Sequence, residues 1–285
     1  MKTLRECVQE AREKNIAIGH FNVSNLEAVW AIFRAAKELN QPVIIGVSEG
    51  ERKFVGTKQI TAIVKSIREE FNYPIFLNSD HTHSFESVKE VVEAGFDGAM
   101  IDGSKFSFDE NVELTKKTVD FAREFSQKTG KDILIEGELG YLGASSKLLD
   151  EIPEDVEMTT TSVEDAKIFV EKTGVDVLAP SIGNIHGMVK SGNPHIDSNL
   201  VKKIAENTQV QLVLHGGSGI VDEEVRQGIK NGISIVHVNT EIRVAFREGL
   251  EKSLKENDSI APYKYLQLPK DRIYQVVLEK IKLFA

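Results

Sequence analysis

The sequence predicts an α/β protein, a closed (β/α)8 barrel (TIM barrel) with extra helices at both ends of the chain, and three observations predict it. Eight short runs of β-branched and other apolar residues recur without polar alternation, as strands covered on both faces require. Segments with the helical period of apolar residues lie between them. The chain of 285 residues is long enough for eight strand–helix units of roughly 30 residues each, and such barrels typically take about 250 residues.

The predicted strands are nearly continuous in apolar residues, and a helix-like segment follows each of them. In chain order they are "IAIGHFNV" from Ile16, "PVIIGVS" from Pro42, "PIFLNSD" from Pro74, "GAMID" from Gly98, "DILIEGE" from Asp132, "VDVLAPS" from Val175, "VQLVLH" from Val210 and "ISIVHVN" from Ile233. Because strands and helices alternate, the expected sheet is parallel.

Helix boundaries are signalled by capping residues. Ser24 and Glu27 have the spacing of a capping box before the first amphipathic stretch that follows a strand. Ser84 precedes another such stretch, and Gly95 then lies where a helix C-terminus favours positive φ. Ser162 opens a later helix in the same way as Ser84.

A doubly wound open sheet is the alternative fold. That fold usually has fewer strands and a glycine fingerprint after the first one, whereas here the first strand leads into "HFNVSNLE". Helices expected at 4–14 and 271–283 would close the bottom of the barrel or serve an interface. With neither a linker nor a low-complexity segment in the sequence, residues 1–285 are expected to form one barrel domain.

The composition limits the classes of partner and compartment. A formal net charge of −9 without a basic stripe speaks against binding to nucleic acid or to an anionic membrane surface. The single Cys7 excludes an intrachain disulfide and a CxxC metal site, which fits a reducing cytosol. The N-terminus lacks a signal-type apolar core, and no run approaches transmembrane length. We therefore expect a cytoplasmic protein.

Polar side chains gather where the predicted strands end, at the rim where barrel enzymes place catalytic groups. His81, His186 and His215 follow three different strands, and carboxylates such as Asp80 and Asp102 end neighbouring ones. One histidine alone is more often a hydrogen-bonded core or loop residue. Together, three imidazoles with an open fourth position favour a catalytic zinc site whose ligands nearby carboxylates orient.

The stretch "HGGSG" from His215 to Gly219 is the second signal. Glycines directly after a strand let backbone N–H groups approach an anion, and Ser218 adds a hydroxyl. A plain strand-to-helix turn is the alternative for such a segment taken alone. Because Thr240 opens a helix after the next strand, phosphate binding is favoured at this end of the barrel.

At these residues the chain resembles the class II, zinc-dependent ketose-bisphosphate aldolases, the family of fructose- and tagatose-bisphosphate aldolases. The resemblance covers almost the whole length and is carried by an ordered set of motifs. These are "GHFNVSNLEA", "SDHTHS", "MIDGS", "EGELG", "SIGNIHG", "LHGGSGI", "NTEIR" and "KYLQLPKDRI".

The resemblance assigns residue roles by position. His81, His186 and His215 look like the zinc ligands, and Asp80 looks like the acid/base at the C4 hydroxyl of the ketose. The resemblance also implies two further sets of site residues. Beside the metal lie Glu138 and Asp102; substrate and phosphate are bound by Asn22, Ser48, Gly187, Lys190, Gly216, Gly217, Ser218, Asn239 and Thr240, with a monovalent cation (Na+ or K+) assisting, and Lys270 meets the second phosphate.

The implied reaction is reversible cleavage of a ketose (bis)phosphate, such as fructose 1,6-bisphosphate, to dihydroxyacetone phosphate and an aldehyde, glyceraldehyde 3-phosphate. Breaking the C3–C4 bond leaves a carbanion, which zinc stabilises as an enediolate without a Schiff-base lysine. Asp80 removes the C4 proton, and a second group must protonate C3. A homodimer or homotetramer is also implied.

The loop that is mobile in the family has a different sequence in this chain. A Glu-Asp pair, whose Glu carries the C3 proton, is replaced by Ser146 and Lys147. A serine hydroxyl is too weak an acid or base near neutral pH to replace it. Asp150 or Glu151 could enter from the same loop, although a solvated charge is the simpler interpretation.

The last strand departs as well, because Val236 and His237 stand where a Lys-x-Asn pattern is common. His237 titrates near neutrality, so it could carry the C3 proton or only donate a hydrogen bond. Three alternatives stay open: an aldolase for a different or non-phosphorylated ketose, a catalytically weak zinc- and phosphate-binding regulatory subunit, and an unrelated barrel with structural histidines.

Overall fold

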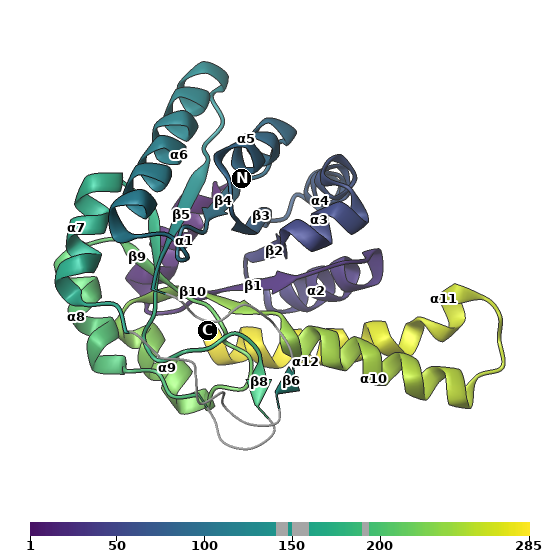
Figure 1. The fold of residues 1–285 in the computed structure, drawn as a ribbon. Helices are drawn as coiled ribbons and strands as arrows, with labels where there is room; N and C mark the ends of the chain where they lie inside the picture. Colours follow the sequence, from purple (N-terminus) through teal and green to yellow (C-terminus); the bar gives the residue numbers. More distant parts are fainter. Residues whose placement is uncertain (141–147, 150–159, 190–193) are drawn as a thin grey trace.

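Eight parallel strands close into a barrel in the computed structural model, which describes residues 1–140, 148–149, 160–189 and 194–285 (Figure 1). The barrel order is β1-β10-β9-β7-β5-β4-β3-β2, and β1 pairs with β10 to close it. The predicted fold class is confirmed. The barrel strands are β1 (Ile18–Asn22), β2 (Val43–Val47), β3 (Ile75–Thr82), β4 (Gly98–Ile101), β5 (Leu134–Leu139), β7 (Val177–Pro180), β9 (Gln211–Leu214) and β10 (Ile233–Val238).

Helices alternate with the strands and surround the barrel (Figure 1). A separate two-stranded sheet, β6 (Leu148–Leu149) and β8 (Met188–Val189), was not expected from the sequence. The helices are α1 (Leu4–Lys14), α2 (Leu26–Leu39), α3 (Glu49–Val55), α4 (Thr57–Phe71), α5 (Phe85–Ala94), α6 (Phe108–Thr129), α7 (Val163–Thr173), α8 (Ser198–Thr208), α9 (Asp222–Asn231), α10 (Thr240–Glu256), α11 (Pro262–Tyr265) and α12 (Gln267–Phe284).

Two apolar cores account for the apolar strands, one between the strands and the outer helices and one inside the barrel. The inner core is small and lies at the amino-terminal end, where Ile18, Phe76 and Ile235 meet Leu4 and Val8 of α1. Each such side chain contributes about 1.5–3 kcal/mol when fully buried. Helix α1 therefore closes the bottom of the barrel, and polar side chains are left to the carboxyl-terminal rim.

Capping explains where most helices begin. Ser84 accepts a hydrogen bond from the backbone of Ser87 at the start of α5, and Ser162 caps α7, both as expected. The expectation for Ser24 was wrong, because Asn25 is the N-cap of α2 and its side chain accepts from the backbone N–H of Ala28. Asparagine and serine cap with similar strength, so two adjacent capping residues cannot be ranked by type alone.

The terminal helices lie where the sequence places them. Helix α12 packs against α2 and α10, and the ends of α10 and α12 extend with α11 beyond the barrel as an arm, the yellow-green and yellow ribbon in Figure 1. This arm exposes Leu254, Ile260 and Tyr263. Among the helices that the structure describes, none is both long and apolar enough to cross a bilayer.

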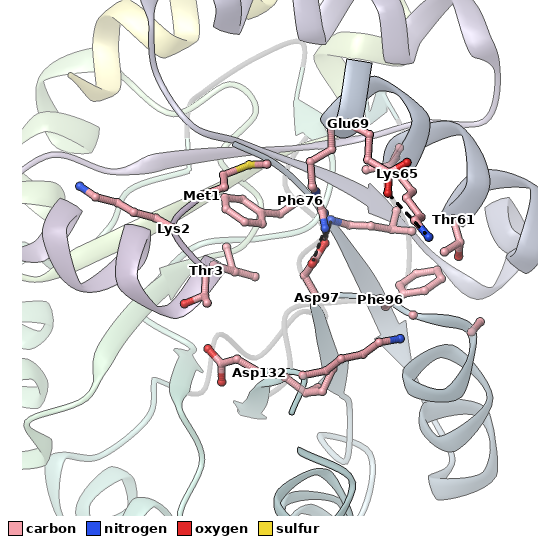
Figure 2. A pocket seen from close by; sticks show the side chains of 18 residues that line it. Met1, Lys2, Thr3, Thr61, Lys65, Glu69, Phe76, Phe96, Asp97 and Asp132 are labelled. Carbon is pink, nitrogen blue, oxygen red and sulfur yellow. Dashed lines mark hydrogen bonds and ion pairs between the residues drawn. The ribbon is translucent and has the colours of Figure 1, made fainter. Parts of the chain in front are cut away.

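A pocket lies at the amino-terminal end of the barrel, beside the start of α1 (Figure 2). Its central charges are satisfied internally: Arg68 forms an ion pair with Asp97, with 3.0 Å between Nη1 and Oδ1, and donates to the carbonyl of Ile75. Asp97 also accepts the backbone N–H of Leu77. These contacts join α4, β3 and the loop before β4, which is a structural role.

Gly46 of β2 leaves the space that the His20 ring occupies, because a Cβ at position 46 would overlap that imidazole. Replacing Gly46 by alanine should therefore destabilise the protein by about 2 kcal/mol, the usual scale of overpacking. Urea unfolding measures the change. Gly50→Ala is the control, because nothing lies within 4 Å of a Cβ there. Equal stability of the two variants would contradict the expected overlap.

Candidate functional site

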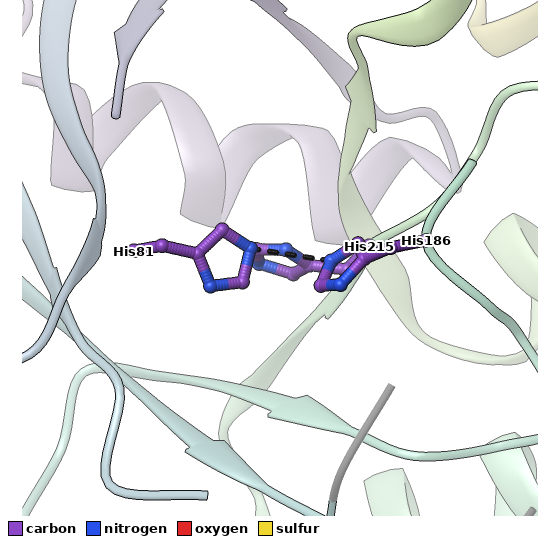
Figure 3. Close-up of side chains that lie close together, drawn as sticks. All are labelled: His81, His186 and His215. Carbon is purple, nitrogen blue, oxygen red and sulfur yellow. Dashed lines mark hydrogen bonds between the residues drawn. The ribbon is translucent and has the colours of Figure 1, made fainter. Parts of the chain in front are cut away.

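Three histidines meet at the carboxyl-terminal rim of the barrel (Figure 3). His81 is the penultimate residue of β3, His186 lies in the segment after β7, and His215 follows β9. The Nε2 atoms of His81 and His186 are 3.2 Å apart, and one ring nitrogen from each of the three lies within 4.8 Å of the others. The structure thus brings together the three predicted zinc ligands at a separation that one metal ion can bridge.

The backbone of β3 allows Asp80 and His81 to serve one site. Neighbouring side chains of a strand normally point to opposite faces. Here the pairing of β3 with β4 shifts register between Ser79 and Thr82, and His81 has a φ of 38°, in the left-handed region that non-glycine residues seldom adopt. Such a backbone costs on the order of 1–3 kcal/mol and is typically kept at functional sites.

Carboxylates fix the orientation of two of these imidazoles. His81 Nδ1 lies 2.9 Å from Asp102 Oδ2 and 3.6 Å from Glu138 Oε2, and His215 Nε2 lies 2.6 Å from Glu136 Oε1. When these nitrogens donate to the carboxylates, His81 Nε2 and His215 Nδ1 keep their lone pairs. This is the usual support of metal-binding histidines, so the residues fit a divalent metal such as zinc.

Buried charge around the three histidines also favours a cation. Burial alone would lower the pKa of the His81 imidazole, but Asp80, Asp102 and Glu138 outweigh burial and raise that pKa to about 10. Burial raises the pKa of Glu138 to about 7. The carboxylates therefore favour a positive charge at His81. A proton on the imidazole can provide that charge, or a bound divalent ion can provide it instead.

One carboxylate oxygen of Asp80 accepts a hydrogen bond from a neighbouring side chain, and the other accepts none. Its Oδ2 accepts a hydrogen bond of 2.9 Å from Asn22 Nδ2, and its Oδ1 is buried without a hydrogen-bond partner, 3.3 Å from His237 Nδ1. Burial raises the pKa of Asp80, but His81 and His237 outweigh it and hold that pKa well below its usual range. Asp80 is thus ionised, which is the form that can accept a proton.

His237 lies between two other imidazoles. Its ring stacks on His20 with centroids 3.5 Å apart and planes 2° from parallel, and the His215 ring is 4.0 Å away on a tilt of 39°. Neither ring nitrogen of His237 has a hydrogen-bond partner, and burial holds its pKa well below the usual value. Asn78 donates to His20 Nε2 at 3.2 Å, which places His20 under His237.

His20 was not singled out from the sequence, although a signal existed. It stands two residues before Asn22 on β1, so both side chains point to the same face of the strand. Glu51 was also missed, because it lies within α3 and not at the end of a predicted strand.

The loops after β9 and β10 form the other side of the site. Gly216 has a φ of 63°, and the N–H of Gly217 donates to the carbonyl of His237 at 3.0 Å. Thr240 opens the long helix α10, whose N-terminus favours an anion. A small cavity of about 20 Å³ joins the two sides and is lined by Asn22, Asp80, His81, His186, Gly187, His215, Gly216, Ser218, His237, Asn239 and Thr240.

Some expected residues lie elsewhere. Ser48 and Lys270 do not line this cavity, and the Ser48 hydroxyl donates to Glu51 at 2.9 Å. His83 Nδ1 is 3.5 Å from Asp102, but its side chain is 44% exposed and it belongs to none of the groups of described residues that could hold a metal. The remaining predictions fall on positions outside the described residues, namely Ser146, Lys147, Asp150, Glu151 and Lys190.

Comparison with known proteins gives consistent matches over the full length. The family model described as class-II fructose-bisphosphate aldolase matches residues 2–285. The fructose-bisphosphate aldolase of Geobacillus stearothermophilus is 35% identical over 287 residues, covering 99% of this chain and 96% of the relative. The probable fructose-bisphosphate aldolase of Bacillus subtilis is 36% identical over 287 residues, covering 99% of this chain and 97% of that protein.

Solved structures show the same similarity. The YdjI aldolase of Escherichia coli K12 superposes with a TM-score of 0.83 at 30% identity, covering 100% of this chain and 98% of the other. The fructose-bisphosphate aldolase of Campylobacter jejuni superposes with a TM-score of 0.80 at 21% identity, covering 99% and 93% respectively, and that similarity supports the fold.

Proposed function

Because the chain belongs to the class-II fructose-bisphosphate aldolase family and is a carbon–carbon lyase, we propose that it reversibly cleaves a ketose (bis)phosphate. Fructose 1,6-bisphosphate, giving dihydroxyacetone phosphate and glyceraldehyde 3-phosphate, is the first candidate, and carbohydrate metabolism, with glycolysis foremost, is the proposed setting. The observation that carries the proposal is the meeting of three imidazoles with Asp80 in one cavity beside the loops after β9 and β10.

We propose zinc as the metal and His81, His186 and His215 as its ligands. The imidazole donors, the carboxylates behind two of them and the surplus of buried negative charge all support this choice. Bound zinc would act as a Lewis acid and stabilise the negative charge that cleavage of the C3–C4 bond leaves on carbon.

Asp80 takes the proton from the C4 hydroxyl. Its depressed pKa keeps it ionised, and Oδ1 is the oxygen that accepts no hydrogen bond, with His237 Nδ1 3.3 Å away. A substrate hydroxyl in the cavity would supply the missing hydrogen-bond partner of that oxygen, which places the proton donor next to its acceptor.

His237 is the proposed proton carrier at C3. It lines the cavity, and neither of its ring nitrogens makes a hydrogen bond, although Nδ1 lies 3.3 Å from Asp80 Oδ1 and Nε2 lies 3.9 Å from Glu136 Oε2. The His20 ring stacks on it and the His215 ring packs against it at a tilt. Because burial holds its pKa well below the usual value, the ring is neutral, and one of its nitrogens can donate a proton while the other can accept one. This assignment gives the chain a proton carrier in place of the glutamate that Ser146 replaces.

The phosphate of dihydroxyacetone phosphate is proposed to lie against Gly187, Gly216, Ser218 and the start of α10, with Gly217 shaping the loop. The N-cap residue of α10, Asn239, makes no side-chain cap, and the Glu241 N–H donates to Ser218 Oγ over a long 3.4 Å, so the start of this helix and Ser218 lie together where an anion is favoured. Asn239 Oδ1 is buried without a hydrogen-bond partner, and an amide oxygen of this kind suits a monovalent cation beside the phosphate.

A homodimer or homotetramer in the cytoplasm is proposed as the functional form. The apolar side chains that the arm exposes, Leu254, Ile260 and Tyr263, support association. Lys270 does not line the cavity of its own chain, so it would act on substrate in a neighbouring subunit. The lone Cys7 fits a reducing compartment.

A ketose lacking the second phosphate is the alternative substrate. Within the cavity as the structure describes it, the lining includes neither lysine nor arginine, and the Ser48 hydroxyl is occupied by Glu51. Both observations leave the far end of the substrate without an evident anion partner.

A substrate panel with zinc analysis tests the proposal. We expect cleavage of fructose 1,6-bisphosphate, or of a ketose 1-phosphate, that chelation abolishes and added zinc restores. The wild type should also exchange the C3 proton of dihydroxyacetone phosphate with solvent, and His237→Phe should lose that exchange while still binding zinc. A protein that binds dihydroxyacetone phosphate without exchange or cleavage would instead be the regulatory subunit.

A further inference from the structure

We propose that Glu51 is a positioning residue for Asp80, acting through Asn22, and that it determines which oxygen of Asp80 faces the substrate. The inference rests on the proposed role of Asp80 as the proton acceptor. Glu51 neither lines the cavity nor belongs to a group that could hold the metal, so its role depends on what it holds in place.

Asn22 is the link between the two carboxylates. Its Nδ2 donates to Asp80 Oδ2 and to Glu51 Oε2, each at 2.9 Å, so both amide hydrogens are used. All three residues are buried, with exposed fractions of 3% for Asn22, 4% for Asp80 and 7% for Glu51. A buried amide between two acceptors has one orientation that satisfies both, and turning it would place a carbonyl oxygen against carboxylates.

Both carboxylate oxygens of Glu51 also accept hydrogen bonds from other residues. Its Oε2 also accepts the backbone N–H of Ser48 at 2.8 Å and the Ser48 hydroxyl at 2.9 Å, and its Oε1 accepts Arg243 Nη2 at 2.8 Å. The contacts come from the start of α3, from β1 and from α10, which are far apart in sequence. Charge-assisted bonds of this kind are the stronger ones, and the pair with Arg243 offsets the cost of burying the carboxylate.

The consequence for Asp80 is a fixed division of its two oxygens. Asn22 occupies Oδ2, while Oδ1 is left without a hydrogen-bond partner beside His237. Without Glu51, the Asn22 amide would lose one of its two acceptors and could swing away, which frees the Asp80 carboxylate to rotate. Small misplacements of a reacting group are costly to the rate even when substrate binding is kept.

Helix capping is the competing explanation. Glu51 is the N3 residue of a capping box whose N-cap is Ser48, and such a box needs no connection to a site. Helix α6 begins with the same box, made by Ser107 and Glu110, and Glu110 is exposed and remote from the cavity. The pair Glu51→Ala and Glu110→Ala therefore separates capping from positioning.

The experiment measures kcat and KM for fructose 1,6-bisphosphate, or for the best substrate of the panel, together with bound zinc and the thermal midpoint. We expect Glu51→Ala to lower kcat by about 10- to 100-fold with KM within about threefold, the range seen when the support of a reacting group is removed. Zinc content should stay at the wild-type level. Glu51→Gln keeps an acceptor for Asn22 and should recover most of kcat, and Glu110→Ala should keep wild-type kcat.

An effect on the thermal midpoint alone, with kcat of Glu51→Ala at the wild-type value, would overturn the inference and leave capping as the role. Should Glu51→Ala not fold, Arg243→Met serves instead, since it removes the partner of Oε1 at a side chain that is 48% exposed. A reduced kcat with unchanged KM supports positioning, and an unchanged kcat overturns it. Cleavage by the wild type in the same assay tests the proposed function separately.

Discussion

His81→Ala is expected to abolish zinc binding and to reduce cleavage by about a thousandfold or more, while the barrel stays folded. The Nε2 atom of His81 lies 3.2 Å from Nε2 of His186, a second proposed ligand. The other ring nitrogen of His81, Nδ1, is oriented by the carboxylate of Asp102. A Lewis acid contributes several kcal/mol to stabilising the charge on the carbon left by cleavage, and each 1.4 kcal/mol is about tenfold in rate. Metal analysis and steady-state kinetics measure both effects.

The control for His81 is His83→Ala. His83 is two residues further along, half-exposed, and 3.5 Å from the same Asp102 oxygen, yet it belongs to none of the described groups that could hold a metal. It should keep zinc at the wild-type level and most of the activity. Retention of stoichiometric zinc by His81→Ala would refute the proposed ligand set.

Chelated wild-type protein should remain folded, which makes the metal effect reversible. In the absence of a metal, the carboxylates around His81 raise its pKa to about 10, so the imidazole carries a proton that partly replaces the ion's charge. The buried carboxylates therefore do not lose all of their compensation when zinc leaves. Activity should return on adding zinc to the chelated enzyme.

Asp80→Asn is expected to lower kcat by about 10²- to 10⁴-fold, the usual contribution of a positioned general base. The change preserves shape, and an asparagine oxygen at position 80 can still accept from Asn22. What is lost is the negative charge and the ability to take a proton. Binding of dihydroxyacetone phosphate should change little, because the proposed phosphate contacts lie at Gly187 and on the loops after β9 and β10.

A matched change on the surface controls for the loss of one negative charge. Asp109 is exposed near the start of α6 and does not line the cavity, so Asp109→Asn should leave kcat unchanged. An Asp80→Asn variant within about tenfold of the wild-type kcat would exclude Asp80 as the proton acceptor at C4.

The sequence was informative wherever a local pattern implies a local structure. Apolar runs such as "PVIIGVS" became buried strands, Ser84 and Gly95 marked the ends of α5, and glycines after β9 adopted positive φ. These features depend on neighbours a few residues away. The choice between Ser24 and Asn25 as a cap was mistaken because both types satisfy the same local rule.

Strand ends could also be located, since parallel strands of a closed barrel bring their carboxyl ends to one rim. This property allowed His81, His186 and His215 to be grouped although up to 134 residues separate them, the difference between positions 215 and 81. The position of Lys270 relative to the cavity could not be obtained in this way, because it lies on a terminal helix outside the repeating units.

By itself, the sequence determined the alternation of strands and helices, the closed parallel barrel and the rim at which the histidines gather, because periodicity and capping act over a few residues. Only the tertiary structure decided that His20 stacks on His237 and that Arg243, Glu51 and Asn22 form a chain of hydrogen bonds to Asp80. The physical reason is that the orientation of a side chain inside a packed site depends on its contacts with segments distant in sequence. A pattern of neighbouring residues carries no information on how those segments pack together.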